Sequence, residues 1–288
     1  MASEHQRRCG ESAQLLRYPT APVTAPPTIA AFHAPPVSEV VLGVQFEPIT
    51  ALRAPLIAGW SELRAKFPVW EEKAALRLVQ EWFGVRAPSP DLFDVRLGNE
   101  PPPVRAWLVT KDESELLQIQ EGALFRNWRR RGEAVYPRYS HLRGEFQADC
   151  RKLFALVDAA GLGLPAVTQC EVTYVNTIPL DGVAVEEVIQ AWRGGASDNF
   201  LPEHDATQIA MHYTIPGGKG PTGRLHVVAV IQREKKELTL TLTARGAPEG
   251  TTLDDALDWL DVGRRWVVSG FCSVTTEFAK VKLWRRSV

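Results

Sequence analysis

The sequence has few cysteines and no long apolar run, and each shortage excludes a class of protein. Its four cysteines, Cys9, Cys150, Cys170 and Cys272, are widely spaced and form no C-x-x-C pair. A disulfide framework and a cysteine-based zinc knuckle are therefore disfavoured. No run of about 18 apolar residues occurs, so the sequence predicts no transmembrane helix and no membrane partner.

The sequence also has almost no net charge. Lys and Arg total 33 and Asp and Glu total 34, which leaves a formal net charge of -1. This balance disfavours a protein that coats nucleic acid by bulk electrostatics. Arg7 and Arg8 are not followed by the apolar segment that a secretory signal requires. Cysteines without an export signal predict a cytoplasmic location.

Motifs for catalysis and cofactor binding are also scarce. Neither G-x-S-x-G nor H-E-x-x-H occurs, and the run GGKGPTG lacks the spacing of a phosphate loop, so we interpret it as a hairpin turn. These absences favour a non-catalytic binding protein without a cofactor. A hydrolase with dispersed catalytic residues is the alternative, because such sites are defined by geometry and not by sequence order.

Two histidines flank this turn symmetrically. His212 and His226 lie equally far from Lys219, so a hairpin would place them opposite each other on two strands. A metal would need a third ligand, such as His204 or Asp205, and no recognisable spacing supplies one. We therefore predict a polar pair on the sheet and no metal.

The N-terminal part of the chain differs in composition from the rest. Residues 19–36 are rich in Pro and Ala, which is typical of an extended segment without helix or sheet. We expect residues 1–35 to form a flexible leader outside the fold. A short docked strand is the alternative.

The remaining chain repeats one order of elements, in residues 36–163 and again in residues 164–288. The central hairpins match at an offset of 122, from Trp107 to Ala229, and the opening strands match at 128, from Val44 to Val172. Nearly equal offsets predict tandem duplication of one β-α-β-β-β-α unit within a continuous body. The alternative is that the alternation in any α+β protein matches by chance.

The first unit opens with an alternating strand from Val40 to Phe46, and a helix is predicted over 52–67. A less regular stretch extends to about residue 103. Strands are predicted over 104–110, 115–120 and 123–130. A long helix with Ser140 as candidate cap closes the unit. The apolar stripe of this helix comprises Leu142, Phe146, Cys150, Leu153 and Val157.

The second unit has the same plan. An alternating strand over 168–174 precedes a predicted helix over 185–193. Strands follow over 207–215, 224–232 and 237–246, and a long helix starts near Thr252. In the last strand, Leu238, Leu240 and Leu242 alternate with Thr239, Thr241 and Thr243. The pattern predicts curved antiparallel sheets with long helices on one face and the other face open to water, a ligand or a partner. This topology resembles helix-grip and saddle-shaped folds.

The most unusual segment extends from Phe125 to Arg143. It holds six arginines and one acidic residue, Glu133, with Trp128, Tyr136 and Tyr139 interleaved. Arginine with aromatic residues suits phosphate groups and bases, and it suits a carboxylate-rich protein equally. A solvated loop whose arginines pair internally is the third interpretation.

Side chains at alternate positions of a strand share a face, so further residues can belong to this candidate surface. Gln118, Gln120, Arg126, Trp128 and Arg130 are all even-numbered, so they would line one surface if no bulge intervenes. Asn127 and Arg129 would then point the other way. The complete set of candidate binding residues is Gln118, Gln120, Arg126, Trp128, Arg129, Arg130, Tyr136, Arg138, Tyr139 and Asn176.

Several of these residues form short motifs: Gln118-x-Gln120, Asn127-Trp128-Arg129, Tyr136-Pro137-Arg138-Tyr139 and Tyr174-x-Asn176. Together they resemble a sporadically distributed bacterial family of uncharacterised proteins that shares Q-x-Q, N-W-R, Y-P-x-Y and Y-x-N motifs. The resemblance covers about residue 34 to the C-terminus and supplies no catalytic residues.

The patchy distribution of that family implies horizontally exchanged genes, which often encode defence or toxin–antitoxin components. We therefore expect a protein partner encoded by an adjacent gene. A small-molecule or nucleotide sensor with a pocket between sheet and helices, and a nucleic-acid-binding protein, are the alternatives.

Overall fold

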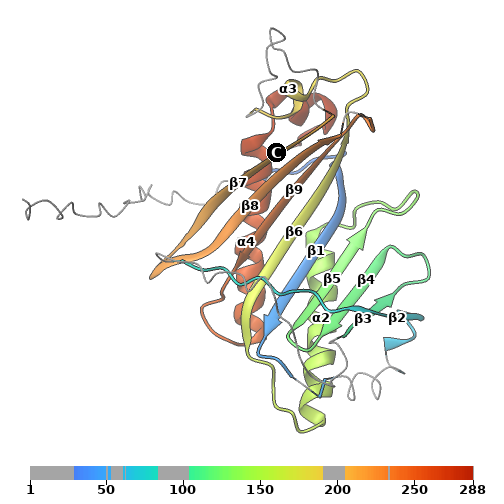
Figure 1. Cartoon of the computed structure of the whole chain (residues 1–288), viewed down its shortest axis with the longest axis vertical. Helices are drawn as coiled ribbons and strands as arrows, with labels where there is room; N and C mark the ends of the chain where they lie inside the picture. Colours follow the sequence, from blue (N-terminus) through green and yellow to red (C-terminus); the bar gives the residue numbers. More distant parts are fainter. Residues whose placement is uncertain are drawn as a thin grey trace, which may run out of the picture.

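Alternating apolar residues build one large antiparallel sheet. The computed structural model describes residues 29–49, 51–52, 61, 63–83, 104–190, 205–232 and 234–287. Within these residues the sheet has nine strands in the order β2-β3-β4-β5-β1-β6-β9-β8-β7 (Figure 1). The strands are β1 (Val37–Phe46), β2 (Val69–Ala74), β3 (Val104–Val109), β4 (Glu115–Gln120), β5 (Ala123–Arg129), β6 (Val167–Pro179), β7 (Ala206–Gly217), β8 (Gly220–Gln232) and β9 (Glu237–Gly246). The fold is therefore α+β and dominated by its sheet.

The two predicted units meet at the centre of this sheet. Strand β1 pairs with β6, and each of the two also pairs with the last strand of its own half, β5 or β9. The strand order is thus the same when it is read outward from the central pair, except that β2 adds an edge strand to the first half.

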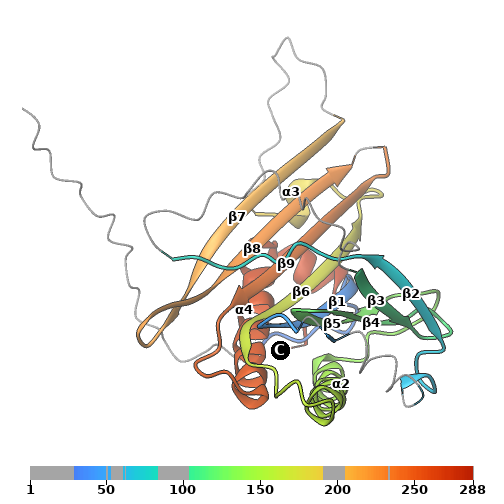
Figure 2. The ribbon, with the colours of Figure 1, turned by 60° about the horizontal axis from the view of Figure 1, so that its bottom comes forward.

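Helices α2 (Tyr139–Ala159) and α4 (Leu253–Val274) lie on one face of the sheet (Figure 2). The predicted apolar stripe of α2 is confirmed, because all five of its residues are buried. The predicted cap was wrong: Arg138, and not Ser140, occupies the N-cap, with a positive φ of 74° and no capping hydrogen bond from its side chain. Helix α4 instead has a capping box between Thr252 and Asp255.

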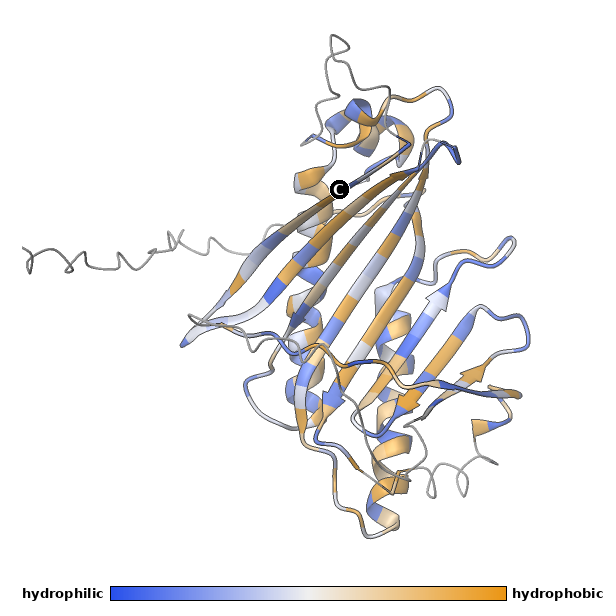
Figure 3. Cartoon of the chain, viewed as in Figure 1, coloured by the Kyte–Doolittle hydropathy of each residue, from blue (hydrophilic) through white to orange (hydrophobic). Residues whose placement is uncertain are grey.

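The predicted sidedness of β9 is confirmed. Leu238, Leu240 and Leu242 are fully buried in the layer that α4 covers, and the intervening threonines lie on the opposite face. The hydropathy colours alternate along the central strands accordingly (Figure 3). Cys150 and Cys170 are buried in the same core, and burial raises the pKa of both thiols, so they act as small apolar residues there.

The end of the leader is docked, which corrects the expectation for residues 29–35. Phe32 is buried against Phe271 and Trp284 and forms a β-bridge with Arg286. Burial of an aromatic ring removes a large apolar surface from water, so it holds this end of the leader in place. The rest of the predicted leader, residues 1–28, lies outside the described residues.

Two helices differ from their predictions. Most of the helix predicted over 52–67 lies outside the described residues. Helix α3 spans only Val185–Val188, followed by a bridge at Ile189, and the end of its predicted range lies outside the described residues. A π-helical turn, η1 (Ala279–Leu283), follows α4. Among the described helices, none combines the length and apolar character that crossing a membrane requires.

Candidate functional site

An extended segment crosses the sheet face opposite α2 and α4. This segment, residues 75–83, is called the strap below. It leaves β2 at one edge of the sheet and passes over the central strands towards β8, drawn in teal in Figures 1 and 2. Its residues have no regular secondary structure, so its main-chain polar groups need partners from the sheet.

Gln120 on β4 binds the start of the strap. Its side-chain Oε1 accepts a hydrogen bond from the Leu76 amide at 2.9 Å, and its Nε2 donates to the Leu76 carbonyl at 3.0 Å. A primary amide carries one carbonyl and one NH₂ group, as a neighbouring strand would present C=O and N–H. Gln120 therefore pairs with the strap as a strand would.

Two further glutamines repeat this contact in the middle of the strap. Gln169 on β6 donates to the Val79 carbonyl, and its Oε1 accepts from the Glu81 amide at 2.8 Å. Gln45 on β1 donates to the same Val79 carbonyl at 3.3 Å. The side chain of Gln80 returns a hydrogen bond to Gln45 at 2.9 Å. The sheet thus binds the main chain of the strap at successive points.

The register of the sheet explains this alignment. Gln120 pairs with Ala123 on β5, Ala123 pairs with Gln45 on β1, and Gln45 pairs with Gln169 on β6. The three glutamines therefore stand in one row perpendicular to the strands, and the small Ala123 leaves room between them. Beside this row, Gly122 lies under Leu78, whose methyl group would be 3.3 Å from any Cβ added there.

The far part of the strap is held by one carboxylate. Glu81 accepts hydrogen bonds from Arg224 at 2.9 Å and from Arg245 at 3.2 Å, and it contacts His226 Nε2. Its side chain is 4% exposed. Burial raises the pKa of this carboxyl, but the His226 hydrogen bond and the charges of His226, Arg245 and Arg224 lower it more, so the pKa lies below its usual value.

The strap is not held by its large apolar side chains. Leu76, Val79 and Trp82 are 43%, 52% and 57% exposed, so they project away from the sheet. Side chains of the strap thus contribute little to the contact, apart from those of Glu81, Gln80, the half-buried Leu78 and Phe83, whose ring lies 5.0 Å from the Arg224 guanidinium. The sheet therefore holds the strap mainly through its main chain and the Glu81 carboxylate.

The predicted histidine pair is confirmed. His212 and His226 are register partners on β7 and β8, and their Nδ1 atoms are 2.8 Å apart. Burial and the neighbouring charges of His226 and Arg224 lower the pKa of His212. Within the part of the chain that the structure describes, no group of three metal-ligating side chains occurs.

The predicted common surface was wrong for Arg126 and Trp128. Gln118 pairs with Phe125 across the β4–β5 hairpin, whereas Arg126 pairs with Leu117. The connecting turn has two residues, so even positions on β4 share a face with odd positions on β5. Gln118 and Gln120 therefore lie on the open face, and Arg126 and Trp128 lie on the face that the helices cover.

Gln118 belongs to a polar chain beside the strap. It accepts from Arg105 at 2.7 Å and donates to Asn127 at 2.6 Å, and Asn127 donates to Glu39 at 2.6 Å. The Q-x-Q pair thus divides its roles: Gln120 binds the strap, and Gln118 continues a polar row across β3, β4, β5 and β1.

Arg126 is an internal residue. It is 1% exposed and forms ion pairs with Asp149 on α2 and with Glu115 on β4. Trp128 is buried as well and packs against Tyr136, with ring centroids 5.4 Å apart. Both predicted binding residues therefore stabilise the contact between the sheet and its helix side.

The other predicted residues are scattered. Arg129 donates to the Glu113 carbonyl, and Asn176 donates to the Leu240 carbonyl between two strands. Tyr139 donates to Asp261 at 2.7 Å and thereby joins α2 to α4. Three predicted residues, Arg130, Tyr136 and Arg138, line a separate pocket described below.

Sequence reasoning missed Gln45, Gln169, Glu81, Arg224 and Arg245. A signal for the first two is present, since Gln45 and Gln169 are polar residues within apolar strands and are both 2% exposed. A buried amide side chain needs a hydrogen-bond partner, so such positions indicate a contact on that face. No protein-family model, curated protein or solved structure matches this chain.

Proposed function

We propose that the protein is a non-catalytic binding protein that holds an extended polypeptide carrying an acidic residue on the open face of its sheet. The strap is the occupant of this face within the chain. The observation that carries the proposal is the row of Gln120, Gln45 and Gln169, whose amides pair with the strap's main chain.

Main-chain recognition fits binding of a partner in extended form. Each glutamine offers a donor and an acceptor to groups that every non-proline residue carries, so the row itself does not select a side chain. Selection comes from the pocket of Arg224, His226 and Arg245, which encloses a carboxylate. A segment with Glu at this position satisfies both parts of the face.

This proposal makes the partner a protein, in agreement with the expectation of a partner encoded by an adjacent gene in a defence or toxin–antitoxin system. Its cytoplasmic location is part of the proposal and is supported by three free cysteines among the described residues. Membership of the sporadic bacterial family is likewise proposed, on the motif residues alone.

We also infer that the sheet arose by tandem duplication of a β-α-β-β-β-α unit, in a helix-grip or saddle-like arrangement. The matching strand order on either side of β1 and β6 supports this origin.

The test uses a labelled nine-residue peptide with the strap's sequence, ALRLVQEWF, and the full-length Glu81→Gln protein. The substitution weakens the internal strap and leaves the Arg224, His226 and Arg245 pocket available. Fluorescence anisotropy should show saturable binding, at least about tenfold tighter than to the unmodified protein.

A matched peptide with Gln in place of the glutamate tests whether the carboxylate is recognised. We expect it to bind about tenfold more weakly than the glutamate peptide, because it lacks the charge that the two arginines pair with. Equal binding of the two peptides, or no binding of either, contradicts the proposal.

A further inference from the structure

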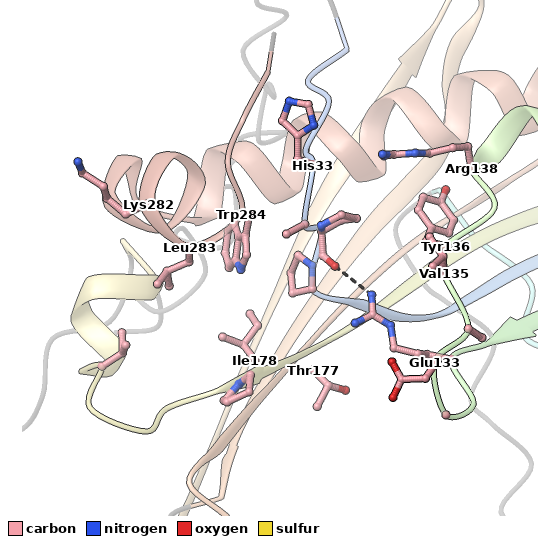
Figure 4. Close-up of a pocket in the computed structure, with 18 residues that line it drawn as sticks. His33, Glu133, Val135, Tyr136, Arg138, Thr177, Ile178, Lys282, Leu283 and Trp284 are labelled. Carbon is pink, nitrogen blue, oxygen red and sulfur yellow. Dashed lines mark hydrogen bonds between the residues drawn. The ribbon is translucent and has the colours of Figure 1, made fainter.

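A pocket separate from the strap lies at the other end of β1. It has a volume of about 720 Å³ and forms where four segments meet: the residues before β1, the loop between β5 and α2, the end of β6, and the end of η1 with Trp284 after it. This volume falls within the range of small-molecule sites, roughly 300–1,000 Å³. Figure 4 shows Arg138, Tyr136 and Glu133 on one side, Lys282, Leu283 and Trp284 on the other, and His33 between them.

The charges that line this pocket are mainly positive. Arg130, Arg138 and Lys282 contribute cations, and Glu133 is its acidic residue. Arg130 donates to the Pro35 carbonyl and Arg138 to the Phe32 carbonyl, both at 3.1 Å. These contacts orient the guanidinium groups, and neither group forms an ion pair with another described residue.

This arrangement differs from that of three arginines elsewhere in the sheet. Arg126, Arg224 and Arg245 each pair with a carboxylate. Within the described residues, neither Arg130 nor Arg138 has an ion pair. A guanidinium that is positioned by a carbonyl can still bind the oxygens of an anion with its remaining N–H groups.

The other wall of the pocket is apolar and firmly supported. Trp284 is buried and packs against Phe271 at 4.8 Å between ring centroids, and Ile178 and Leu283 lie beside it in the pocket. Opposite this wall, the guanidinium of Arg138 lies 5.9 Å from the centre of the Tyr136 ring. The pocket therefore offers two guanidinium groups on one side, and on the other an apolar surface with Lys282 beside it.

We propose that this pocket binds a small organic anion, with a carboxylate or phosphate group on an apolar body. Arg130 and Arg138 bind the acidic group, and the apolar body packs against Trp284 and Ile178. The site is independent of the strap and of the proposed polypeptide-binding face, since the two share no residue.

The test titrates the full-length protein with 8-anilinonaphthalene-1-sulfonate, an aromatic anion whose fluorescence increases in apolar surroundings. We expect saturable binding of one molecule, weakened about tenfold by Arg130→Gln and by Arg138→Gln. The control is Arg131→Gln, which removes the same charge from an exposed position outside the pocket and should change the affinity by less than about twofold. Phenyl phosphate and benzoate, added as competitors, then distinguish phosphate from carboxylate ligands.

Lys282→Gln provides a second variant, because this exposed side chain can be changed without disturbing the fold. It should weaken binding by about threefold. Absence of saturable binding to the unmodified protein overturns the proposal. Equal weakening by Arg131→Gln and the pocket variants overturns it too, since the dye would then respond to overall charge.

Trp82→Ala should leave binding of the dye unchanged. Loss of dye binding in that variant would place the dye at the strap and overturn the proposal.

Discussion

At the scale of single residues, burial and partners decide what each arginine does. Arg126 is enclosed between β4, β5 and α2 and neutralises Asp149 and Glu115. Burial raises the pKa of Asp149, and the charge of Arg126 offsets this only in part. Arg224 and Arg245 instead hold the strap's carboxylate. Within the arginine-rich segment, Arg126 is internal, whereas Arg130 and Arg138 line the pocket, so the segment is not one functional patch.

Replacing Arg126 should destabilise the fold strongly. In Arg126→Ala, the buried Asp149 loses its ion-pair partner, which should cost about 3–5 kcal/mol. Urea unfolding monitored by circular dichroism measures this loss. Arg131→Ala, at an exposed position, should change stability by less than about 0.5 kcal/mol. Similar losses of stability in both variants would show that the ion pairs of Arg126 do not stabilise the fold.

The Glu81 contact should depend on pH. Because its pKa in the folded protein is below the ordinary 4.5, its stabilising contribution is fully present above that value and is lost as pH falls through the lower folded pKa. At pH 7, Glu81→Gln should reduce the free energy of unfolding by about 2 kcal/mol.

Urea unfolding of both proteins between about pH 7 and pH 3 tests this dependence. The difference between Glu81→Gln and the unmodified protein should shrink as the solution becomes acidic. Glu133→Gln, which removes an exposed carboxylate, should show no such trend. A constant difference across the range would mean that the charge of Glu81 does not hold the strap.

At the scale of elements, regular periodicity made most of the sheet and both long helices predictable. The strand over 237–246 was predicted with its observed bounds, because its leucines and threonines alternate without interruption. The strap was not predicted, since an extended segment has no period of its own. Its partners Gln45 and Gln169 lie 34 and 90 residues from Val79 in the sequence, and local patterns contain no information on such contacts.

The candidate site was predicted only in part for the same reason. Gln120 was selected from the sequence, and the structure places it under the strap. Gln118 and Arg126 were assigned to one surface by parity, and the two-residue turn at Glu121 and Gly122 places them on opposite faces. The length of this one turn therefore decides which residues of β4 and β5 share a face.

The neighbouring glutamines of β4 offer a matched comparison. Gln120→Ala removes two hydrogen bonds to Leu76 and should loosen the start of the strap by about 1 kcal/mol, which corresponds to about fivefold faster hydrogen exchange of the Leu76 amide. Gln118→Ala lies two residues away on the same face and binds Arg105 and Asn127 instead.

Hydrogen exchange with mass spectrometry on peptides covering residues 75–83 reads out both variants. The strap in Gln118→Ala should exchange at the rate of the unmodified protein. Equal acceleration in both variants would mean that the sheet as a whole has loosened, and no acceleration in Gln120→Ala would mean that its amide does not hold the strap.

At the scale of the whole molecule, α2 and α4 lie on one face of the sheet and, within the described residues, the strap crosses the other. The core beneath the helices supplies the stability, and the open face carries the polar residues that bind a main chain. A partner polypeptide must therefore compete with the strap, which is tethered at high effective concentration.

Replacing residues 75–83 by nine Gly and Ser residues tests this account most directly, because it empties the face without changing the sheet. The Kd of the labelled ALRLVQEWF peptide, measured by anisotropy, should be about 100-fold lower for this variant than for the unmodified protein. An equal Kd for the two proteins, or no binding to the emptied face, would contradict the account.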